Sequence, residues 1–338
     1  MANTHELPPQ AQLMQSMFGF MVTKCLSAVA FHNVPDALKD GPLYYTDLAS
    51  VTGTDQRALH RVMRMLSSAG MFKETEPGTF ALTPASELLC ADAPGSMREM
   101  AVMMTSPSHW LPWGRMEDTL KSGESGPQHA FGVDFFGWCQ REENSEQWEI
   151  FNAAMTSFSS GTSHAVADAF DFGGFKHIVD IGGGHGYFLK TILEKAPNAK
   201  GTLFDLPGVV EGADARKLGD RIDPQSGDFF KAVPAGGDCY TLKHIIHDWG
   251  DEQSITILKN IADSMAADGR VLLVETVMPD SPEPHPAKFM DVNMLAMTEG
   301  GCERTEKEYT NLFAKAGLKL VKIHPTASPM SIVEAAKA

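Results

Sequence analysis

The sequence predicts an α/β protein in which a doubly wound, largely parallel sheet follows a mainly helical N-terminal part. After Gly174, short apolar runs typical of buried strands alternate with segments of helical periodicity. Before Gly174, apolar residues recur mostly at helical spacing. The length of 338 residues also exceeds the size at which one core usually stays undivided, so we expect more than one domain.

Composition argues against several classes of protein. The net charge of −15 disfavours a polyanionic partner such as nucleic acid, because phosphate binding needs a concentrated set of Lys and Arg. The five cysteines are spread singly, which favours a reducing cytoplasm over a disulfide framework. The first ten residues resemble no signal peptide, and no later stretch has the long uncharged apolar run of a membrane span. The sequence therefore predicts a cytoplasmic protein that binds neither nucleic acid nor membranes.

The first predicted helix, residues 11–30, is apolar over most of its circumference. It has few charges and carries Leu13, Met14, Met17, Phe18, Phe20, Met21, Leu26 and Val29. A helix of this kind must be buried against something, and a terminal helix is hard to enclose within its own small domain. We therefore expect a second copy of the chain to cover it in a homodimer.

The next segment has the pattern of a winged helix. Thr46 begins a short helix, Thr54 caps a longer one, and Gly70 ends it. Two short strands then flank a turn at Pro77 and Gly78. By pattern alone, this order of elements is also compatible with DNA binding.

The charge of the longer helix disfavours DNA binding. It offers only Arg57, Arg61 and Arg64, and its surroundings are acidic. We therefore interpret residues 1–95 as a winged-helix-like dimerisation domain.

Residues 96–170 lie between the two predicted domains. The stretch 95–137 is rich in Met, Trp, Pro and Phe, and an amphipathic helix follows from Trp148 to about Phe170. These apolar residues are either ordinary core or walls of a substrate pocket. We assign the segment as a helical linker that contributes to a pocket.

Residues 171–338 contain the predicted sheet. The buried-strand candidates are the runs HIVDI, GTLFDL, DCYTL and GRVLLVET. Helices are expected at about 186–196, 208–218 and 252–267. Strands that alternate with helices in this way predict a parallel sheet with helices on both faces.

A glycine-rich turn follows the first strand, with Gly182, Gly183, Gly184 and Gly186. Such a turn lets the backbone approach a cofactor in the crevice outside the strand ends. It is compatible with NAD, FAD or S-adenosylmethionine, but its GxGxG spacing differs from the GxGxxG that seats a pyrophosphate. A cofactor without phosphates is therefore favoured.

Polar residues at the ends of the next two strands fit the same cofactor site. Asp205 ends the second strand, where a carboxylate either accepts both ribose hydroxyls or caps a helix. Asp228 and Phe229 end the third strand, where they suit an adenine ring. With the glycine turn in register, the cofactor roles are favoured.

Five motifs in a fixed order carry a resemblance to a known family. They are DIGGGHG, LFDLP, GDFF, LKHIIHDW and EGGCERTEKEY, between residues 180 and 309. Together they resemble plant caffeate-type and bacterial natural-product O-methyltransferases. The resemblance implies a Rossmann-like class I methyltransferase fold that uses S-adenosylmethionine, releases S-adenosylhomocysteine and needs no metal.

The resemblance also implies roles for individual residues. The cofactor contacts fall on Gly182, Gly184, Asp205, Asp228, Phe229 and Lys243. The catalytic positions fall on the general base His247, its neighbour Asp248, and two acidic residues that orient the imidazole, Glu275 and Glu303. The pocket for a small aromatic hydroxyl acceptor matches Phe151, Met155, Met290, Asn293 and Met294.

The chemistry of a phenolic acceptor supports a histidine base. A phenol has a pKa of about 10, so at neutral pH a base with a pKa near ~6.5 must remove its proton as attack proceeds. A carboxylate on the opposite ring nitrogen fixes the tautomer and stabilises the imidazolium. Instead of orienting the imidazole, Glu303 could simply form an ion pair with its neighbour Arg304.

Three alternatives stay open on the sequence alone. One is a relative that binds S-adenosylmethionine but catalyses decarboxylation, hydroxylation or a pericyclic reaction. Another is an NAD-dependent oxidoreductase, which the glycine turn permits. The last is a metal cluster of His244, His247, Asp248 and Cys239, which the spacing and the missing fourth ligand disfavour.

Overall fold

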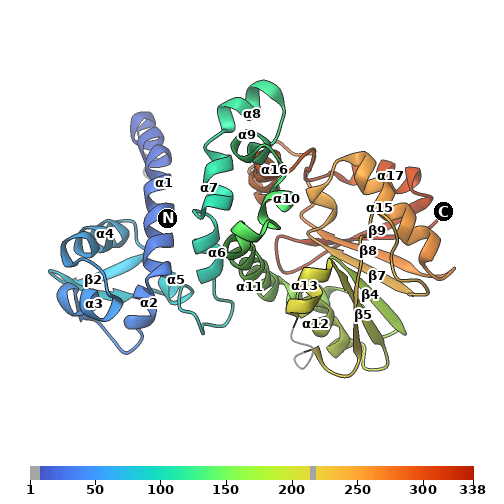
Figure 1. The fold of residues 1–338 in the computed structure, drawn as a ribbon, viewed down its shortest axis with the longest axis horizontal. Coiled ribbons are helices and arrows are strands. Elements are labelled where there is room, and N and C mark those ends of the chain that lie inside the picture. The colour runs from blue at the N-terminus through green and yellow to red at the C-terminus, as the bar shows by residue number, and fades with distance from the viewer. Residues whose placement is uncertain (1–7, 214–217) are drawn as a thin grey trace, which may run out of the picture. The chain divides into compact units, whose positions relative to one another are not determined.

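The computed structural model describes residues 8–213 and 218–338, and the chain divides into two compact units (Figure 1). The first unit contains the chain up to Trp110 together with Glu149–Ser157. The second unit contains Leu111–Trp148 and Phe158–Ala338. The end of the helix expected at 208–218 lies outside the described residues.

The first unit combines helices with a small antiparallel sheet. Its strands, in the spatial order β1-β3-β2, are β1 (Leu43–Tyr44), β2 (Phe72–Glu76) and β3 (Thr79–Leu82). Its helices are α1 (Pro9–Phe31), α2 (Val34–Ala37), α3 (Tyr45–Thr52), α4 (Gln56–Ser68), α5 (Pro84–Glu87), α6 (Arg98–Met103) and the start of α7 (Pro107–Trp113). The succession α3, α4, β2 and β3 matches the winged-helix pattern expected from the sequence.

Helix α4 is capped by a different residue from the one expected. The Oδ1 atom of Asp55 accepts a hydrogen bond from the Ala58 amide at 2.8 Å, whereas Thr54 Oγ1 lies 3.0 Å from Thr52 Oγ1. The assignment of Thr54 as the cap is therefore wrong, because the adjacent carboxylate reaches the free amide of the first turn. Apolar residues of α3, α4 and the strands form the core, including Leu48, Met63, Leu66, Phe72 and Phe80.

Helix α1 exposes much of its apolar surface. Val29 and Ala30 near its C-terminal end are buried, but Leu13 is 65% and Met17 is 56% exposed. Among the described residues, α1 is the one helix that is long and apolar enough to cross a membrane, a test that signal sequences and core helices of soluble proteins also pass. The helix needs a cover that this unit does not supply by itself.

The second unit is built on a seven-stranded sheet in the order β6-β5-β4-β7-β8-β10-β9. The strands are β4 (His177–Ile181), β5 (Lys200–Asp205), β6 (Ile222–Ser226), β7 (Cys239–Lys243), β8 (Arg270–Glu275), β9 (Leu318–Pro325) and β10 (Ser331–Lys337). The five strands β4 to β8 pair in parallel, whereas β10 runs antiparallel to β8 and β9. The parallel doubly wound sheet is thus confirmed, and the antiparallel pair β9–β10 adds to it.

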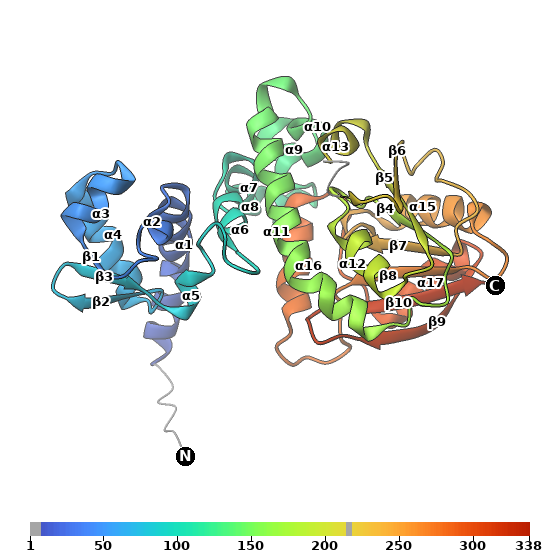
Figure 2. The same cartoon turned by 90° about the horizontal axis from the view of Figure 1, so that it is seen from below.

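The second unit also contains helices. Those before the first strand are α8 (Met116–Ser122), α9 (Gly126–Phe131), α10 (Phe135–Cys139), the 3₁₀ turn η1 (Glu142–Asn144) and α11 (Ser145–Ala169). Those between and after the strands are α12 (Tyr187–Lys195), α13 (Pro207–Gly212), the 3₁₀ turn η2 (Ile246–Asp248), α15 (Asp251–Ser264), α16 (Pro286–Met297) and α17 (Glu306–Lys315). Of these helices, α11 and α12 pack on one face of the sheet and α15 and α17 on the other (Figures 1 and 2).

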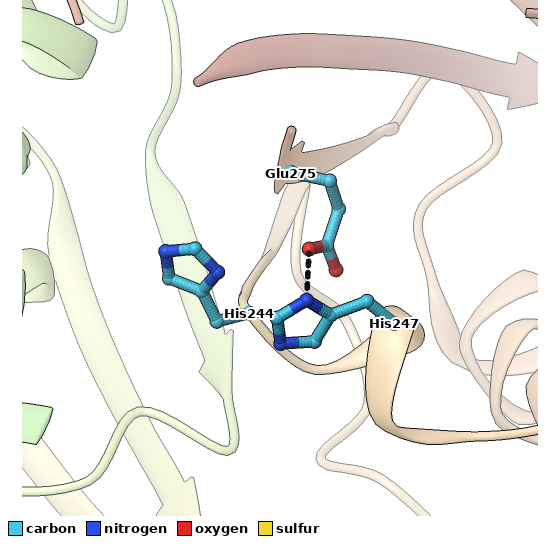
Figure 3. A group of neighbouring side chains, drawn as sticks. All are labelled: His244, His247 and Glu275. Atoms are coloured by element: carbon cyan, nitrogen blue, oxygen red, sulfur yellow. Dashed lines mark ion pairs between the residues drawn. The ribbon is translucent and has the colours of Figure 1, made fainter. Parts of the chain in front are cut away.

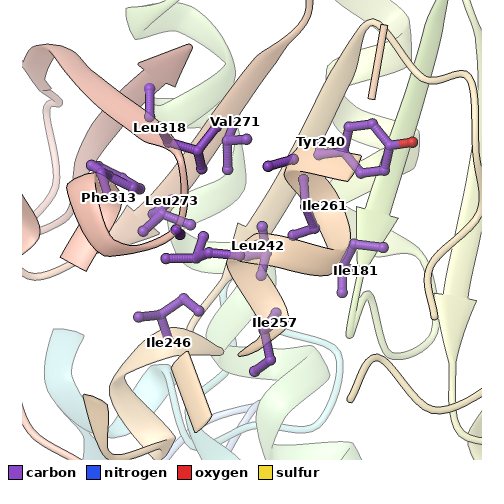
Figure 4. Close-up of a cluster of buried hydrophobic side chains, with 14 of the residues drawn as sticks. Ile181, Tyr240, Leu242, Ile246, Ile257, Ile261, Val271, Leu273, Phe313 and Leu318 are labelled. Atoms are coloured by element: carbon purple, nitrogen blue, oxygen red, sulfur yellow. The ribbon is translucent and has the colours of Figure 1, made fainter. Parts of the chain in front are cut away.

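The strands alternate their apolar side chains between two cores. On β8, Val271 and Leu273 pack with residues of α15 and α17 in the cluster of Figure 4, whereas Leu272 and Val274 pack with residues of α11 and α12. This alternation is the two-residue period of a strand buried on both faces. Because β4, β5, β7 and β8 are parallel, their C-terminal ends lie at the same edge of the sheet, and the residues that follow them gather there.

Candidate active site

The centre of the site is the imidazole of His247, which lies in η2 directly after β7. Its Nδ1 atom lies 2.8 Å from Glu303 Oε1 and 3.8 Å from Glu275 Oε2, and all three side chains are buried. Figure 3 shows Glu275 at the end of β8 facing this ring. The structure therefore brings both predicted glutamates to the same nitrogen, but only Glu303 is within hydrogen-bonding distance.

The other ring nitrogen of His247 has a looser environment. Its Nε2 atom lies 3.6 Å from Asp248 Oδ1, beyond a hydrogen bond. A ring whose Nδ1–H donates to a carboxylate presents the Nε2 lone pair on its other side. The arrangement leaves Nε2 able to accept a proton.

The loop that carries His247 is tied down by its neighbours. Glu275 Oε1 accepts hydrogen bonds from the amides of Ile245 and Ile246 at 3.2 and 3.0 Å. The guanidinium of Arg304 donates to the carbonyls of Ile246 and Trp249 at 3.0 and 2.8 Å. The Glu275 carboxylate thus holds the loop by accepting hydrogen bonds from its backbone amides, and its charge stabilises the protonated imidazole.

Arg304 and Glu303 belong to separate interactions. Arg304 forms its ion pair with Asp251 at 3.0 Å, and the Glu303 amide donates to Asp291 Oδ1 at 3.0 Å. The described contacts contain no Glu303–Arg304 ion pair. Asp291 on α16 and Arg304 are supporting residues that the motifs did not single out, although Arg304 stands within EGGCERTEKEY.

Buried carboxylates set the protonation of this site. Burial by itself would lower the pKa of His247, but the charges of Glu275, Asp248 and Glu303 raise it to about 10. Burial raises the pKa of Glu275 to about 7 and that of Asp248 to about 6. The carboxylates around the ring therefore favour the protonated, imidazolium form of His247.

His244 lies beside the same ring. Its centroid is 5.0 Å from that of His247 and 5.3 Å from that of Phe158, and its φ of 55° is left-handed. Burial lowers the pKa of His244 well below its usual value, and the cations Lys243 and His247 lower it further. His244 is therefore neutral next to a charged neighbour.

The glycine turn faces the same edge of the sheet. Gly184 has a φ of +58° and open space where a side chain would begin, while a Cβ on Gly182 would lie 2.4 Å from Ile245 Cδ1. The positive φ favours glycine at both positions. Gly184 leaves room for a ligand, whereas Gly182 lets the turn pack against the loop after β7.

Asp205 fixes this turn from the end of β5. Its Oδ2 accepts from the Gly184 amide at 2.8 Å and its Oδ1 from the Leu206 amide at 2.7 Å. Burial raises the pKa of Asp205, and these two hydrogen bonds oppose the rise. A carboxylate oxygen has more than one acceptor site, so both atoms keep lone pairs for ribose hydroxyls. The open space at Gly184 and the adjacent carboxylate fit an adenosyl cofactor.

The remaining cofactor candidates lie at the neighbouring strand ends. Asp228 and Phe229 follow β6, and Asp228 Oδ2 pairs with Lys231 at 3.1 Å. Lys243 ends β7, and its Nζ lies 3.2 Å from Ser159 Oγ on α11. Burial lowers the pKa of Lys243 to about 8. The only sequence signal for Ser159 is the run SFSSGTS, which interrupts the apolar pattern of its helix.

The acceptor candidates are divided between two helices. Met290, Asn293 and Met294 lie on α16, and Asn293 Oδ1 accepts a hydrogen bond from the indole of Trp113 at 3.1 Å. Phe151 and Met155 lie on the part of α11 that belongs to the first unit. Trp113 is a further partner that no motif indicated.

Two family models match the chain. An O-methyltransferase domain matches residues 113–319, and an O-methyltransferase dimerisation domain matches residues 14–92. The dimerisation match covers α1 and the winged-helix pattern. The O-methyltransferase match covers the site around His247.

Known proteins resemble the chain over nearly its whole length. A phenazine O-methyltransferase, PhzM, from Lysobacter antibioticus is 39% identical over 333 residues, which cover 97% of this chain and 96% of that protein. The crystal structure of LaPhzM superposes with a TM-score of 0.93 at 39% identity, covering 98% and 100% of the two chains. Human N-acetylserotonin methyltransferase in complex with S-adenosylmethionine gives a TM-score of 0.90 at 28% identity and full coverage of both chains. The chain belongs to the O-methyltransferase family and is an S-adenosylmethionine-dependent enzyme.

Proposed function

We propose that the enzyme methylates a hydroxyl of a small aromatic natural product and that His247 is the general base. The observation that carries this proposal is the buried imidazole whose Nδ1 is held 2.8 Å from Glu303 while Nε2 has no carboxylate within hydrogen-bonding distance. The phenazine O-methyltransferase among the relatives supports an aromatic acceptor.

The raised pKa of His247 matches it to a phenol. The neighbouring carboxylates bring the pKa of the imidazole to about 10, close to that of a phenolic hydroxyl. An imidazole of this basicity is strong enough to take the proton of a phenol once it has lost its own proton. Glu303 stabilises the imidazolium that forms, and Glu275 holds the loop that presents it.

The residues at the strand ends fit S-adenosylmethionine. When bound, this cofactor supplies a methyl group that its sulfonium charge activates toward attack. We assign its contacts to Gly182, Gly184, Asp205, Asp228, Phe229 and Lys243. Asp205 would accept the ribose hydroxyls, and the turn at Gly184 would line the methionyl part. Holding the two reactants in line contributes roughly 7–11 kcal/mol, so this positioning is the main task of the site.

The acceptor contacts are assigned to Phe151, Met155, Met290, Asn293 and Met294. The Asn293 carbonyl accepts from Trp113, which orients the amide and leaves its NH₂ group able to donate. An oxygen or ring nitrogen on the acceptor would receive this hydrogen bond. The apolar side chains would contact the aromatic ring.

The domain arrangement that we propose follows the roles of the segments. Residues 1–95 form the dimerisation domain, residues 96–170 supply helices to the acceptor pocket, and residues 171–338 bind the cofactor. We infer that a second copy of the chain covers α1 and that the protein is a cytoplasmic homodimer.

The test of the base is the variant His247→Ala. We expect turnover to fall by roughly 10²–10⁴ with a phenolic acceptor, while the affinity for S-adenosylmethionine stays close to that of the parent. His32→Ala, at an exposed position, is the control and should turn over normally. Product is identified by mass spectrometry as the acceptor plus one CH₂, formed in proportion to S-adenosylhomocysteine. Near-normal turnover of His247→Ala would remove the base assignment.

A further inference from the structure

Buried polar atoms without partners gather around the catalytic imidazole. Among the described residues, His244 Nε2, Glu275 Oε2 and Glu303 Oε2 are enclosed atoms for which the structure gives no hydrogen bond. Leaving such atoms unpaired is unfavourable, so a group of them indicates an absent ligand or water.

The geometry of these groups suits a metal ion. His244, His247 and Glu275 each offer one ligand atom, and these three atoms lie within 4.8 Å of one another (Figure 3). Two imidazoles and one carboxylate make up a set of ligands that zinc favours, with a fourth position left over. Glu303 Oε1 lies 2.8 Å from Nδ1 of the same imidazole. The sequence grouped Asp248 and Cys239 with the histidines; Asp248 Oδ1 does lie 3.6 Å from His247 Nε2, but the carboxylate that joins both histidines within 4.8 Å is that of Glu275.

Charge also favours a cation at this point. Glu275 and Glu303 are fully buried around one imidazole. A divalent ion would offset the charge of these carboxylates, and His244 Nε2, an enclosed atom without a hydrogen bond in the described structure, would supply a lone pair. A water molecule would pair the same atoms but would bring no positive charge to the two carboxylates.

We propose that a divalent ion of the zinc class binds between His244, His247 and Glu275 and inhibits the enzyme. Ligand atoms of a tetrahedral zinc ion are roughly 3.3–3.6 Å apart, so a small rotation of the side chains closes the site. The ion replaces the proton that His247 shares with Glu303, and its charge makes Nε2 a poor proton acceptor. The inhibition rests on the proposed role of His247, but the binding does not.

Cobalt tests the binding without using activity. Chelator-treated enzyme is titrated with Co²⁺ in the absence of substrates, and we expect the visible band of tetrahedral cobalt to saturate at one ion per chain and to disappear on adding Zn²⁺. His244→Leu and His244→Gln should each bind Co²⁺ about ten-fold or more weakly. His164→Gln, at an exposed position on α11, should bind as the parent does.

Activity then tests the inhibition. Zn²⁺ should abolish methyl transfer over the range in which it displaces Co²⁺, and EDTA should restore it. Each His244 variant, measured against its own activity in EDTA, should need about ten-fold more Zn²⁺ for half inhibition. Absence of the cobalt band in the parent, a sulfur-to-cobalt charge-transfer band from cysteine, or equal binding by parent and both His244 variants overturns the proposal.

The two proposals fail separately. If His247→Ala keeps normal turnover, the base assignment falls while the cobalt band still reports on the metal site. If His247→Ala is inactive and the parent binds no cobalt, only the metal site falls.

Discussion

The imidazole of His247 is more basic than a general base needs to be, because carboxylates outnumber cations around it. The surrounding carboxylates raise its pKa to about 10, which favours the imidazolium form while no ligand is bound. A positive charge that arrives nearby lowers this pKa, because it disfavours the imidazolium. The sulfonium of the cofactor carries such a charge, whereas its thioether product does not.

Binding of S-adenosylmethionine should therefore release more protons than binding of S-adenosylhomocysteine. At neutral pH we expect S-adenosylmethionine to displace a fraction of a proton from His247, and S-adenosylhomocysteine to displace less. Calorimetry in buffers of different ionisation enthalpy measures the number of protons released. His247→Ala is the control, and in it the two ligands should behave alike. Equal release by both ligands in the parent would contradict the assignment.

Glu303 should set the pH dependence of the reaction. Activity falls at low pH because the base is protonated, and Glu303→Gln lowers the pKa of His247 by removing a neighbouring negative charge. The acidic limb of kcat/KM should move to lower pH, while the maximum falls because the imidazolium loses its partner. Glu306→Gln, at an exposed position on α17, is the control. An unshifted limb in Glu303→Gln would show that this contact does not tune the base.

The sequence predicted three residues that the structure brings together, but not which contacts each of them makes. The motifs indicated His247, Glu275 and Glu303, and the structure brings the three together. The sequence could not show that Glu303 makes the 2.8 Å contact with His247, or that Glu275 accepts hydrogen bonds from two backbone amides. These partners are far apart along the chain, so their distances depend on the packing of η2 against β8. Trp113 and Ser159 belong to no motif, and only the packing of their helices reveals them.

At the scale of elements, η2 depends on one buried guanidinium. Arg304→Met should lower the free energy of unfolding by about 2–5 kcal/mol, because two backbone carbonyls and Asp251 lose their charged donor. Urea unfolding measures this loss. Lys307→Met, at an exposed position on α17, should change stability by less than about 0.5 kcal/mol. A similarly small change in Arg304→Met would mean that η2 keeps its structure without the hydrogen bonds from Arg304.

Elements were predictable in proportion to their burial. The apolar runs of β4, β5, β7 and β8 are buried on both faces and stood out in the sequence. In β6, the run IDPQS is exposed after its first residue, and β9 is largely exposed. Such strands carry charged or polar residues and lack the continuous apolar run of a buried strand. The pairing of β10 with β8 joins segments far apart along the chain, so no local pattern indicated it.

At the scale of the whole molecule, we expect two copies to associate through α1. Leu13→Glu with Met17→Glu should convert the dimer to a monomer, because two carboxylates would be buried in an apolar contact. Sedimentation velocity at micromolar concentration measures the change. Val51→Glu, at an exposed apolar position on α3, should leave the assembly intact. A parent protein that already sediments as a monomer would contradict the expectation.

Strand β10 lies between β8 and β9 and supplies hydrogen bonds to both. If it frays, each neighbour becomes an open edge with unpaired amides and carbonyls, and β8 is rich in Val and Leu. Exposed apolar edges recruit strands from other molecules and seed aggregates. We therefore expect cleavage within β10 to cause aggregation of the enzyme as well as loss of activity.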